Sequence, residues 1–157
     1  MKFQLLCIGK TQYAPFKESI ERYTSRIVRY APFELKELPD IRNTKSLTEQ
    51  QQKEAEGELM LASLTNADFL ILLDERGKEY TSRQFAKLIS DKMVTLPARL
   101  VFAIGGPYGF SQKVYDRANG MMSLSKMTFP HELVRLFFVE QLYRAFTILR
   151  GEPYHHD

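Results

Sequence analysis

The stretch RLVFAIGGPYG at residues 99–109 joins a short apolar run to a glycine-rich loop. The run is typical of a buried strand, and Ser111 can cap a short helix that extends to about residue 118. Glycines let backbone amides approach a ligand closely, although the same residues also suit a tight structural turn. Open α/β sheets bind ligands at the carboxyl ends of their strands, so the position of this loop favours ligand binding. The loop matches neither the P-loop pattern nor the dinucleotide-binding pattern of glycines.

Strands and helices alternate outward from this loop in both directions. Apolar runs and period-2 patterns predict strands at residues 2–8, 33–38, 68–73, 99–104 and 121–124. Helices are expected at residues 14–30, 48–64, from 81 onward, 111–118 and 131–150. Residues 74–78 are expected to form a turn. This alternation predicts a single α/β domain over residues 1–157, with a mostly parallel five-stranded sheet and helices on both faces.

Capping boxes mark the start of two of these helices. The helix at 48–64 can begin with Thr48 and Gln51 or with Ser46 and Glu49, so its start is left open. The helix after the third strand begins with a box formed by residues 81 and 84.

The composition is that of a globular protein without a membrane segment. Hydrophobic residues make up 44% of the 157 residues and charged residues 26%, and the apolar runs are far shorter than a bilayer requires. No signal peptide is recognised, and Cys7, the single cysteine, is interpreted as a core residue. We therefore predict a cytoplasmic protein. A formal charge of +3 permits an RNA partner but does not require one.

The helix expected at residues 131–150 is apolar on almost every side. Only a narrow stripe with Glu140, Arg144 and Thr147 is polar, and the first two are spaced for an ion pair. Such a helix must be buried on more than one side, and a sheet covers one side only. We expect a second copy of the chain to cover the rest in a homodimer. The alternative is a central helix inside a compact monomer.

Two further strand ends should lie near the glycine loop, at residues 73–75 and 124–129. The second offers two hydroxyl groups and two apolar side chains, and Pro130 pre-sets the start of the following helix. This combination suits a flat, mostly apolar ligand with a few polar edges, such as an adenosine. The alternative is an ordinary loop before a capped helix.

The C-terminal tail carries the best catalytic candidates, Arg150, Tyr154 and His155. A histidine titrates near neutrality, a tyrosine can stack on a base, and an arginine can hold a phosphate or an oxyanion. A frayed and inert tail is the alternative. His131 is interpreted as structural, and no Cys or His cluster has the spacing of metal ligands, so we predict no metal.

Three stretches carry a resemblance to a known family: IGGPYG at 104–109, SLSKMTFPHELVRLFFVEQLYRAF at 123–146 and RGEPYHH at 150–156. They resemble the large-subunit (23S) rRNA pseudouridine N3-methyltransferase family of the SPOUT, or α/β-knot, superfamily. CIGK at 7–10 and LDERGK at 73–78 extend the resemblance over essentially the whole chain. At 107 and 108, where family members commonly have serine and asparagine, this chain has proline and tyrosine.

The resemblance implies a C-terminal trefoil knot, the cofactor S-adenosyl-L-methionine, and a homodimer that methylates N3 of a pseudouridine in 23S rRNA of assembled ribosomes. The target imide must lose its proton to attack the methyl group, so alignment and a proton acceptor are needed. The implied cofactor-binding residues are Leu73, Gly105, Leu124, Ser125, Lys126, Met127, Thr128 and Phe129. Two other readings remain: an RNA-binding module that uses Arg22, Arg26 and Arg29, and a related knotted methyltransferase that acts on tRNA.

Overall fold

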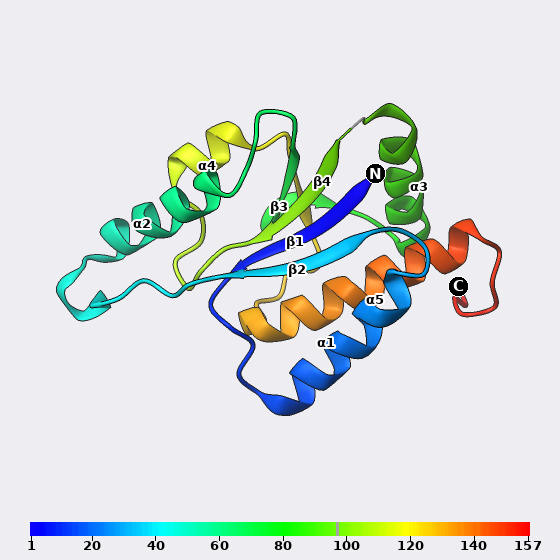
Figure 1. Cartoon of the computed structure of the whole chain (residues 1–157), viewed down its shortest axis with the longest axis horizontal. Coiled ribbons are helices and arrows are strands. Elements are labelled where there is room, and N and C mark those ends of the chain that lie inside the picture. The colour runs from blue at the N-terminus through cyan, green and yellow to red at the C-terminus, as the bar shows by residue number, and fades with distance from the viewer. Residues whose placement is uncertain (97) are drawn as a thin grey trace.

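The computed structural model describes residues 1–96 and 98–157. These residues form one sheet in which every pair of neighbouring strands is parallel, in the order β2-β1-β4-β3-β5 (Figure 1). The strands are β1 (Lys2–Ile8), β2 (Phe33–Leu38), β3 (Phe69–Glu79), β4 (Arg99–Ile104) and β5 (Gly120–Ser123). The α-helices are α1 (Ala14–Ile27), α2 (Glu49–Ala62), α3 (Ser82–Thr95), α4 (Gln112–Arg117) and α5 (His131–Leu149), and a short 3-10 helix, η1 (Thr44–Ser46), precedes α2. The predicted α/β fold is confirmed.

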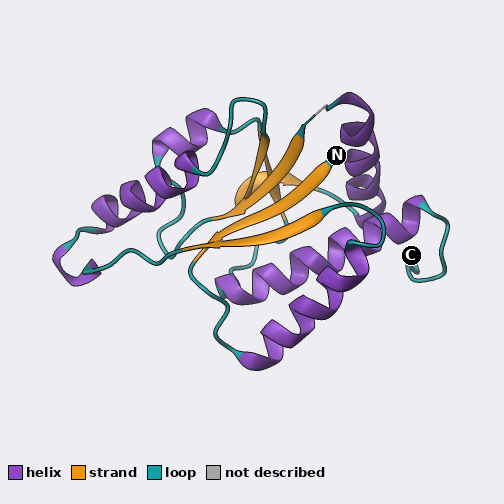
Figure 2. Cartoon of the chain, in the orientation of Figure 1, coloured by secondary structure: helices purple, strands orange, loops and turns teal. Residues whose placement is uncertain are grey.

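Helices cover both faces of the sheet, as predicted (Figure 2). Successive side chains of a strand point to opposite faces, which creates two apolar clusters. Leu5 and Phe102 belong to the cluster beneath α1, α3 and α5. Leu6 and Ala103, one residue further along each strand, belong to the cluster beneath α2 and α4.

Capping boxes mark the starts of α2 and α3, and the structure decides between the two options that the sequence left open for α2. The Thr48 hydroxyl accepts a hydrogen bond from the backbone N–H of Gln51, whose side chain accepts one from the N–H of Thr48. The box at residues 81 and 84 forms in the same way. The competing start is excluded, because Ser46 lies in η1.

The turn expected at residues 74–78 is wrong, because β3 continues to Glu79. The pairing of β3 with β5 changes register between Leu73 and Lys78. A Cβ atom on Gly77 would lie 2.6 Å from the backbone nitrogen of Met122, so only glycine allows the two strands to approach so closely. Leu73 and Lys78 both pair with Met122, so residues 74–77 form an irregularity within β3 that depends on a strand more than forty residues away in the chain.

Helix α5 packs between α1 and α3 as well as against the sheet. The Phe138 ring lies 4.7 Å from the Phe102 ring on β4 and 6.1 Å from the Phe85 ring on α3, and Tyr143 contacts Tyr23 on α1. The premise that the sheet alone covers this helix in a monomer was therefore wrong. No helix among the described residues is long and apolar enough to cross a membrane.

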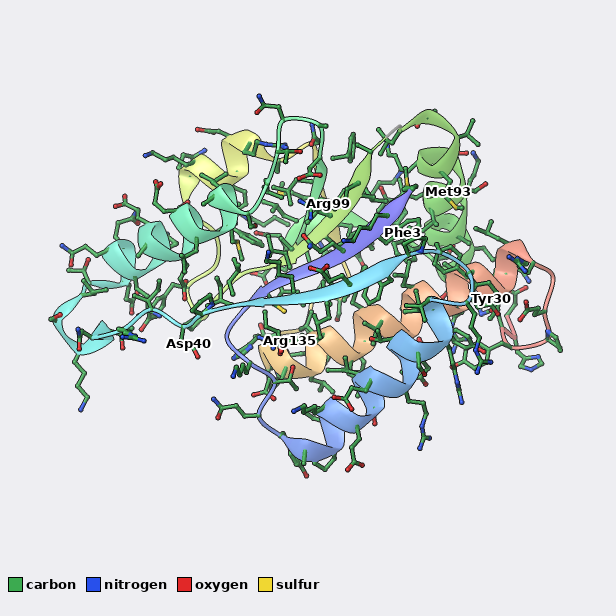
Figure 3. The ribbon with its side chains drawn as sticks, viewed as in Figure 1. Phe3, Tyr30, Asp40, Met93, Arg99 and Arg135 are labelled. Carbon is green, nitrogen blue, oxygen red and sulfur yellow. The ribbon has the colours of Figure 1, made fainter. Side chains whose placement is uncertain are left out.

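Arg135 is fully buried and connects the first turns of α5 to the ends of two strands (Figure 3). Its guanidinium group donates hydrogen bonds to the carbonyl oxygen of Ile8 at 2.7 Å, the hydroxyl of Thr11 at 2.9 Å and the carboxylate of Glu37 at 2.9 Å. A buried charge is tolerated only when it is paired in this way. The start of α5 is thus held in place relative to β1 and β2.

Replacing Arg135 with methionine should lower the free energy of unfolding by about 3 to 5 kcal/mol, because Glu37 loses its charged partner and the Ile8 carbonyl group loses a hydrogen-bond donor. Urea unfolding followed by circular dichroism measures this change. The matched control is Arg83→Met, which removes an exposed ion pair with Asp157 and should leave unfolding nearly unchanged. Equal effects of the two substitutions would contradict the assigned role of Arg135.

Candidate functional site

A cleft of about 640 Å³ lies at the carboxyl ends of the central strands and beside the start of α5. Three segments form its walls: residues 73–76, residues 104–110, and residues 124–131 without Lys126. Tyr115 and Val134 complete the lining. The strand ends expected to converge therefore do converge.

All of the predicted cofactor-binding residues except Lys126 line this cleft: Leu73, Gly105, Leu124, Ser125, Met127, Thr128 and Phe129. The Lys126 side chain is directed elsewhere. Its ammonium group donates to the carbonyl oxygen of Glu75 at 3.4 Å and lies 3.8 Å from the Glu79 carboxylate. The Lys126 side chain therefore does not contribute to the lining of the cleft.

The glycine loop is both a tight turn and a wall of the cleft. The N–H of Gly109 donates to the carbonyl oxygen of Gly106 at 3.1 Å, with Pro107 and Tyr108 between them. Proline is favoured at the second position of such a turn, and Gly109 has φ of 84°, which favours glycine. The two interpretations of the loop are therefore compatible, and Pro107 stiffens the turn.

The loop after β5 is shaped by its own serine residues. The Ser123 hydroxyl donates to the carbonyl oxygen of Ser125, and the Ser125 hydroxyl accepts from the N–H of Met127, both at 2.9 Å. Further along, the Phe129 ring packs edge-on against Phe137 of α5 at 5.2 Å. These contacts fix the conformation of a loop that lines the cleft.

Asp74 brings a carboxylate into the cleft, where the sequence analysis expected residues 73–75 but gave this carboxylate no role. The Tyr115 hydroxyl and the backbone N–H of Arg76 both donate hydrogen bonds to it, and the Arg76 guanidinium group lies over the Tyr115 ring. Burial alone would raise the pKa of Asp74, but these hydrogen bonds hold it below its ordinary value. Asp74 therefore presents a fixed negative charge to a ligand.

A second hollow, which we call the side pocket, adjoins the cleft and has a volume of about 310 Å³. It shares Leu124, Ser125 and Phe129 with the cleft. Its other lining residues are Tyr80, Thr81, Ser82, Phe85, Met122, Ser123, Phe137, Glu140 and Gln141. The polar stripe on α5 is the one feature of the sequence that points to this pocket.

The predicted catalytic residues Arg150, Tyr154 and His155 do not line the cleft. The tail is nevertheless not frayed. The Tyr154 hydroxyl donates to the Glu140 carboxylate at 3.1 Å, and Nδ1 of His155 lies 3.0 Å from the guanidinium group of Arg144. Burial, together with neighbouring hydroxyl and carboxylate groups, raises the pKa of Tyr154, so this residue acts as a hydrogen-bond donor and not as a base.

Two other residues clarify the chemistry of the site. Cys7 is buried, and burial raises the pKa of its thiol to about 12, which confirms a core residue and not a nucleophile. His131 was interpreted as structural, but it lines the cleft, with Nδ1 at 3.5 Å from the Arg135 guanidinium group. Within the described parts of the chain, no three His, Cys, Asp or Glu side chains are grouped as a metal site requires.

Comparisons with known proteins agree on one family. The chain matches the family described as "Predicted SPOUT methyltransferase" over residues 1–155. It is 56% identical to the ribosomal RNA large subunit methyltransferase H of Parabacteroides distasonis over 157 residues, which cover 100% of both chains. It is 54% identical to the proteins of the same name from Christiangramia forsetii, with 99% of each chain covered, and Flavobacterium johnsoniae, with 100% covered.

Replacing Tyr115 with phenylalanine should raise the pKa of Asp74, because the carboxylate loses its hydroxyl donor. NMR titration of the Asp74 carboxyl carbon measures this shift. A lowered pKa stabilises the fold only above that pKa, so the variant should be less stable than the wild type at neutral pH. The two proteins should be equally stable at a pH low enough to protonate Asp74 in both. Tyr108→Phe, also in the cleft, is the control. An unchanged Asp74 titration would show that Tyr115 does not hold this charge.

Proposed function

The chain belongs to the SPOUT methyltransferase family, and we propose that it methylates N3 of a pseudouridine in 23S rRNA of assembled ribosomes, with S-adenosyl-L-methionine as the methyl donor. The observation that carries the proposal is the convergence of three loops on one cleft, each from a stretch that carries the family resemblance. The names of the relatives favour a large-subunit rRNA substrate over tRNA.

The cleft fits S-adenosyl-L-methionine in size and in chemistry. Its volume lies within the range of about 300 to 1,000 Å³ that is usual for ligand sites. Gly105 and the loop at 124–129 would hold the adenosine through backbone groups, and Asp74 offers an acceptor for hydroxyl groups. When bound, the cofactor supplies an electrophilic methyl group on a sulfonium centre.

The chain's own residues must align the target base and receive the proton that N3 loses. Tyr154 stays protonated and its ring can stack on a base, while Arg150 can bind phosphate. His155 is the proposed proton acceptor: Nε2 donates to Asp157 at 2.9 Å, so Nδ1 takes up the proton once its contact with Arg144 is released. Arg26, which lies over the Tyr23 and Tyr143 rings, is available on the same surface to bind RNA.

A homodimer is part of this proposal. Apolar side chains on α5 and on the loop before it are uncovered by the chain itself: Leu149 is 41% exposed and Met127 is 74% exposed. Arg150 follows the last turn of α5, and a helix of 19 residues is about 28 Å long. A partner chain would cover the apolar residues and could bring its own tail to the cleft. The trefoil knot and the cytoplasmic location stay predictions.

Nucleoside mass spectrometry of 23S rRNA tests the proposed function. A strain that lacks this protein should contain unmethylated pseudouridine where the parent strain contains the N3-methylated form. Purified protein and S-adenosyl-L-methionine should restore the methyl group on 70S ribosomes from that strain. A methyl group that persists in the deletion strain would refute the proposal.

Replacing Gly105 with valine should abolish binding of S-adenosyl-L-methionine. Even the Cβ atom would lie 3.1 Å from the carbonyl carbon of Gly109, so a branched side chain forces the turn apart and enters the cleft. Calorimetry measures the affinity, and circular dichroism checks the fold. Gly120→Ala is the control, because nothing lies within 4 Å of its added Cβ atom. Wild-type affinity in folded Gly105→Val would remove this loop from the site.

Truncation after Gly151 should leave cofactor affinity nearly unchanged but abolish methylation of ribosomes, because the tail does not line the cleft. His155→Ala should lower turnover about 10²-fold if the histidine is a general base. Full activity of the truncated chain would exclude the tail from the mechanism.

Mixing the truncated chain with Gly105→Val tests whether the tail acts across the dimer. If it does, the heterodimer contains one intact cleft and one intact tail that serve each other, and activity returns. If the tail acts within its own chain, no complete site exists and none returns. Light scattering must first show dimers, and a single-chain mass at micromolar concentration would contradict the dimer itself.

A further inference from the structure

The side pocket has the position that a methyl acceptor requires. In methyl transfer the acceptor atom must lie next to the donor, so the two ligands need adjoining sites with a common wall. Leu124, Ser125 and Phe129 form such a wall between the cleft and the side pocket. The rings of Tyr80, Phe85 and Phe137 make the remainder largely aromatic, which suits a flat nucleobase.

The polar end of the side pocket is an ordered chain of hydrogen bonds. The Ser82 hydroxyl donates to Oε1 of Gln141 at 2.9 Å, and Nε2 of Gln141 donates to Oε2 of Glu140 at 3.0 Å. The other carboxylate oxygen of Glu140 accepts from Arg144 at 3.0 Å and from Tyr154 at 3.1 Å. The amide of Gln141 has a second N–H, and Oε2 of Glu140 has a further lone pair. The pocket thus presents a donor directly beside an acceptor.

We propose that the side pocket binds the target base and that Glu140 distinguishes pseudouridine from uridine; this inference rests on the function proposed above. Pseudouridine is joined to ribose through C5, so its N1 keeps a hydrogen next to the C2 carbonyl group. Glu140 accepts the N1–H, and Gln141 donates to the C2 oxygen. N3, on the other side of that carbonyl group, then faces the wall shared with the cleft.

Uridine lacks the N–H group that would donate to Glu140. In uridine the corresponding edge offers a carbonyl oxygen beside a C–H group, so Gln141 keeps its partner while the Glu140 carboxylate faces carbon. Leaving a desolvated acceptor unpaired is costly, and sites built to bond a polar hydrogen reject analogues without it strongly. The two neighbouring residues therefore have separable roles: Gln141 holds either base, and Glu140 selects pseudouridine.

Two substitutions separate these roles. The measurement is kcat/KM on ribosomes with pseudouridine at the target position and on ribosomes with uridine there, from a strain that lacks the corresponding pseudouridine synthase. Glu140→Gln should lower the rate on pseudouridine much more than the rate on uridine, so that the ratio falls by about 10²-fold. Gln141→Leu should lower both rates and keep the ratio.

The control concerns the tail, since Glu140 also binds Tyr154. Tyr154→Phe removes that hydrogen bond and should keep the ratio whatever its effect on turnover. A wild-type enzyme that modifies another position would refute the proposed function. A wild-type enzyme that modifies pseudouridine, with a ratio that Glu140→Gln leaves unchanged, would refute this inference alone.

A binding measurement provides a second readout that does not depend on turnover. Pseudouridine nucleoside at millimolar concentration, added to the full-length protein with S-adenosylhomocysteine, should shift the NMR signals of the Gln141 side-chain amide more than uridine does. The Gln84 side-chain amide, engaged in the capping box of α3, should not move. No shift at Gln141 with either nucleoside would show that something other than the base fills this pocket.

Discussion

The buried guanidinium group of Arg135 is the interaction on which the site depends. It fixes the start of α5 against the ends of β1 and β2, and moving that helix would leave a buried charge without partners. The Glu132 carboxylate strengthens the same junction by accepting from the backbone N–H groups of Gln12 and Tyr13. Because the loop at 124–130 leads directly into α5, these contacts set the distance between that loop and the glycine turn. The width of the cleft is therefore determined by residues that mostly lie outside it.

The two hollows of the site are built in different ways. The cleft is lined largely by turns whose backbone conformation is fixed by local features, such as the bond between Gly106 and Gly109 and the bond between Ser125 and Met127. The side pocket instead takes its polar character from side chains on α5 and α3 that bond to one another. Backbone groups are suited to binding a cofactor that is the same in every reaction cycle. Side chains can instead be selected to recognise one particular methyl acceptor. In the proposed mechanism, this division separates the binding of the cofactor from the selection of the substrate.

The features that the sequence predicted are those with local causes. The capping box at Thr48 and the buried strand at 99–104 follow from neighbouring residues, and the cleft follows from strand ends in a parallel sheet. The turn at 74–78 was wrong because the reason for Gly77 lies in β5. The buried contacts of Arg135 and the existence of the side pocket were not predicted. The sequence around an arginine or a glutamine in a helix does not indicate which distant residues these side chains contact. The proposed cofactor residues came from the family resemblance, because periodicity contains no information about them.

Helix α5 contributes to every part of the proposed mechanism, and the contacts between this helix and the tail limit where the tail can act. Its start lines the cleft, its middle lines the side pocket, and the tail folds back from its end as far as Glu140. Tyr154 therefore touches the edge of its own chain's side pocket through one hydrogen bond. If the tail moves to a partner's cleft, that bond and the contact between His155 and Arg144 must break. In that arrangement the bonds to Glu140 and Arg144 oppose the movement, and formation of the dimer or binding of RNA must supply the free energy to overcome them.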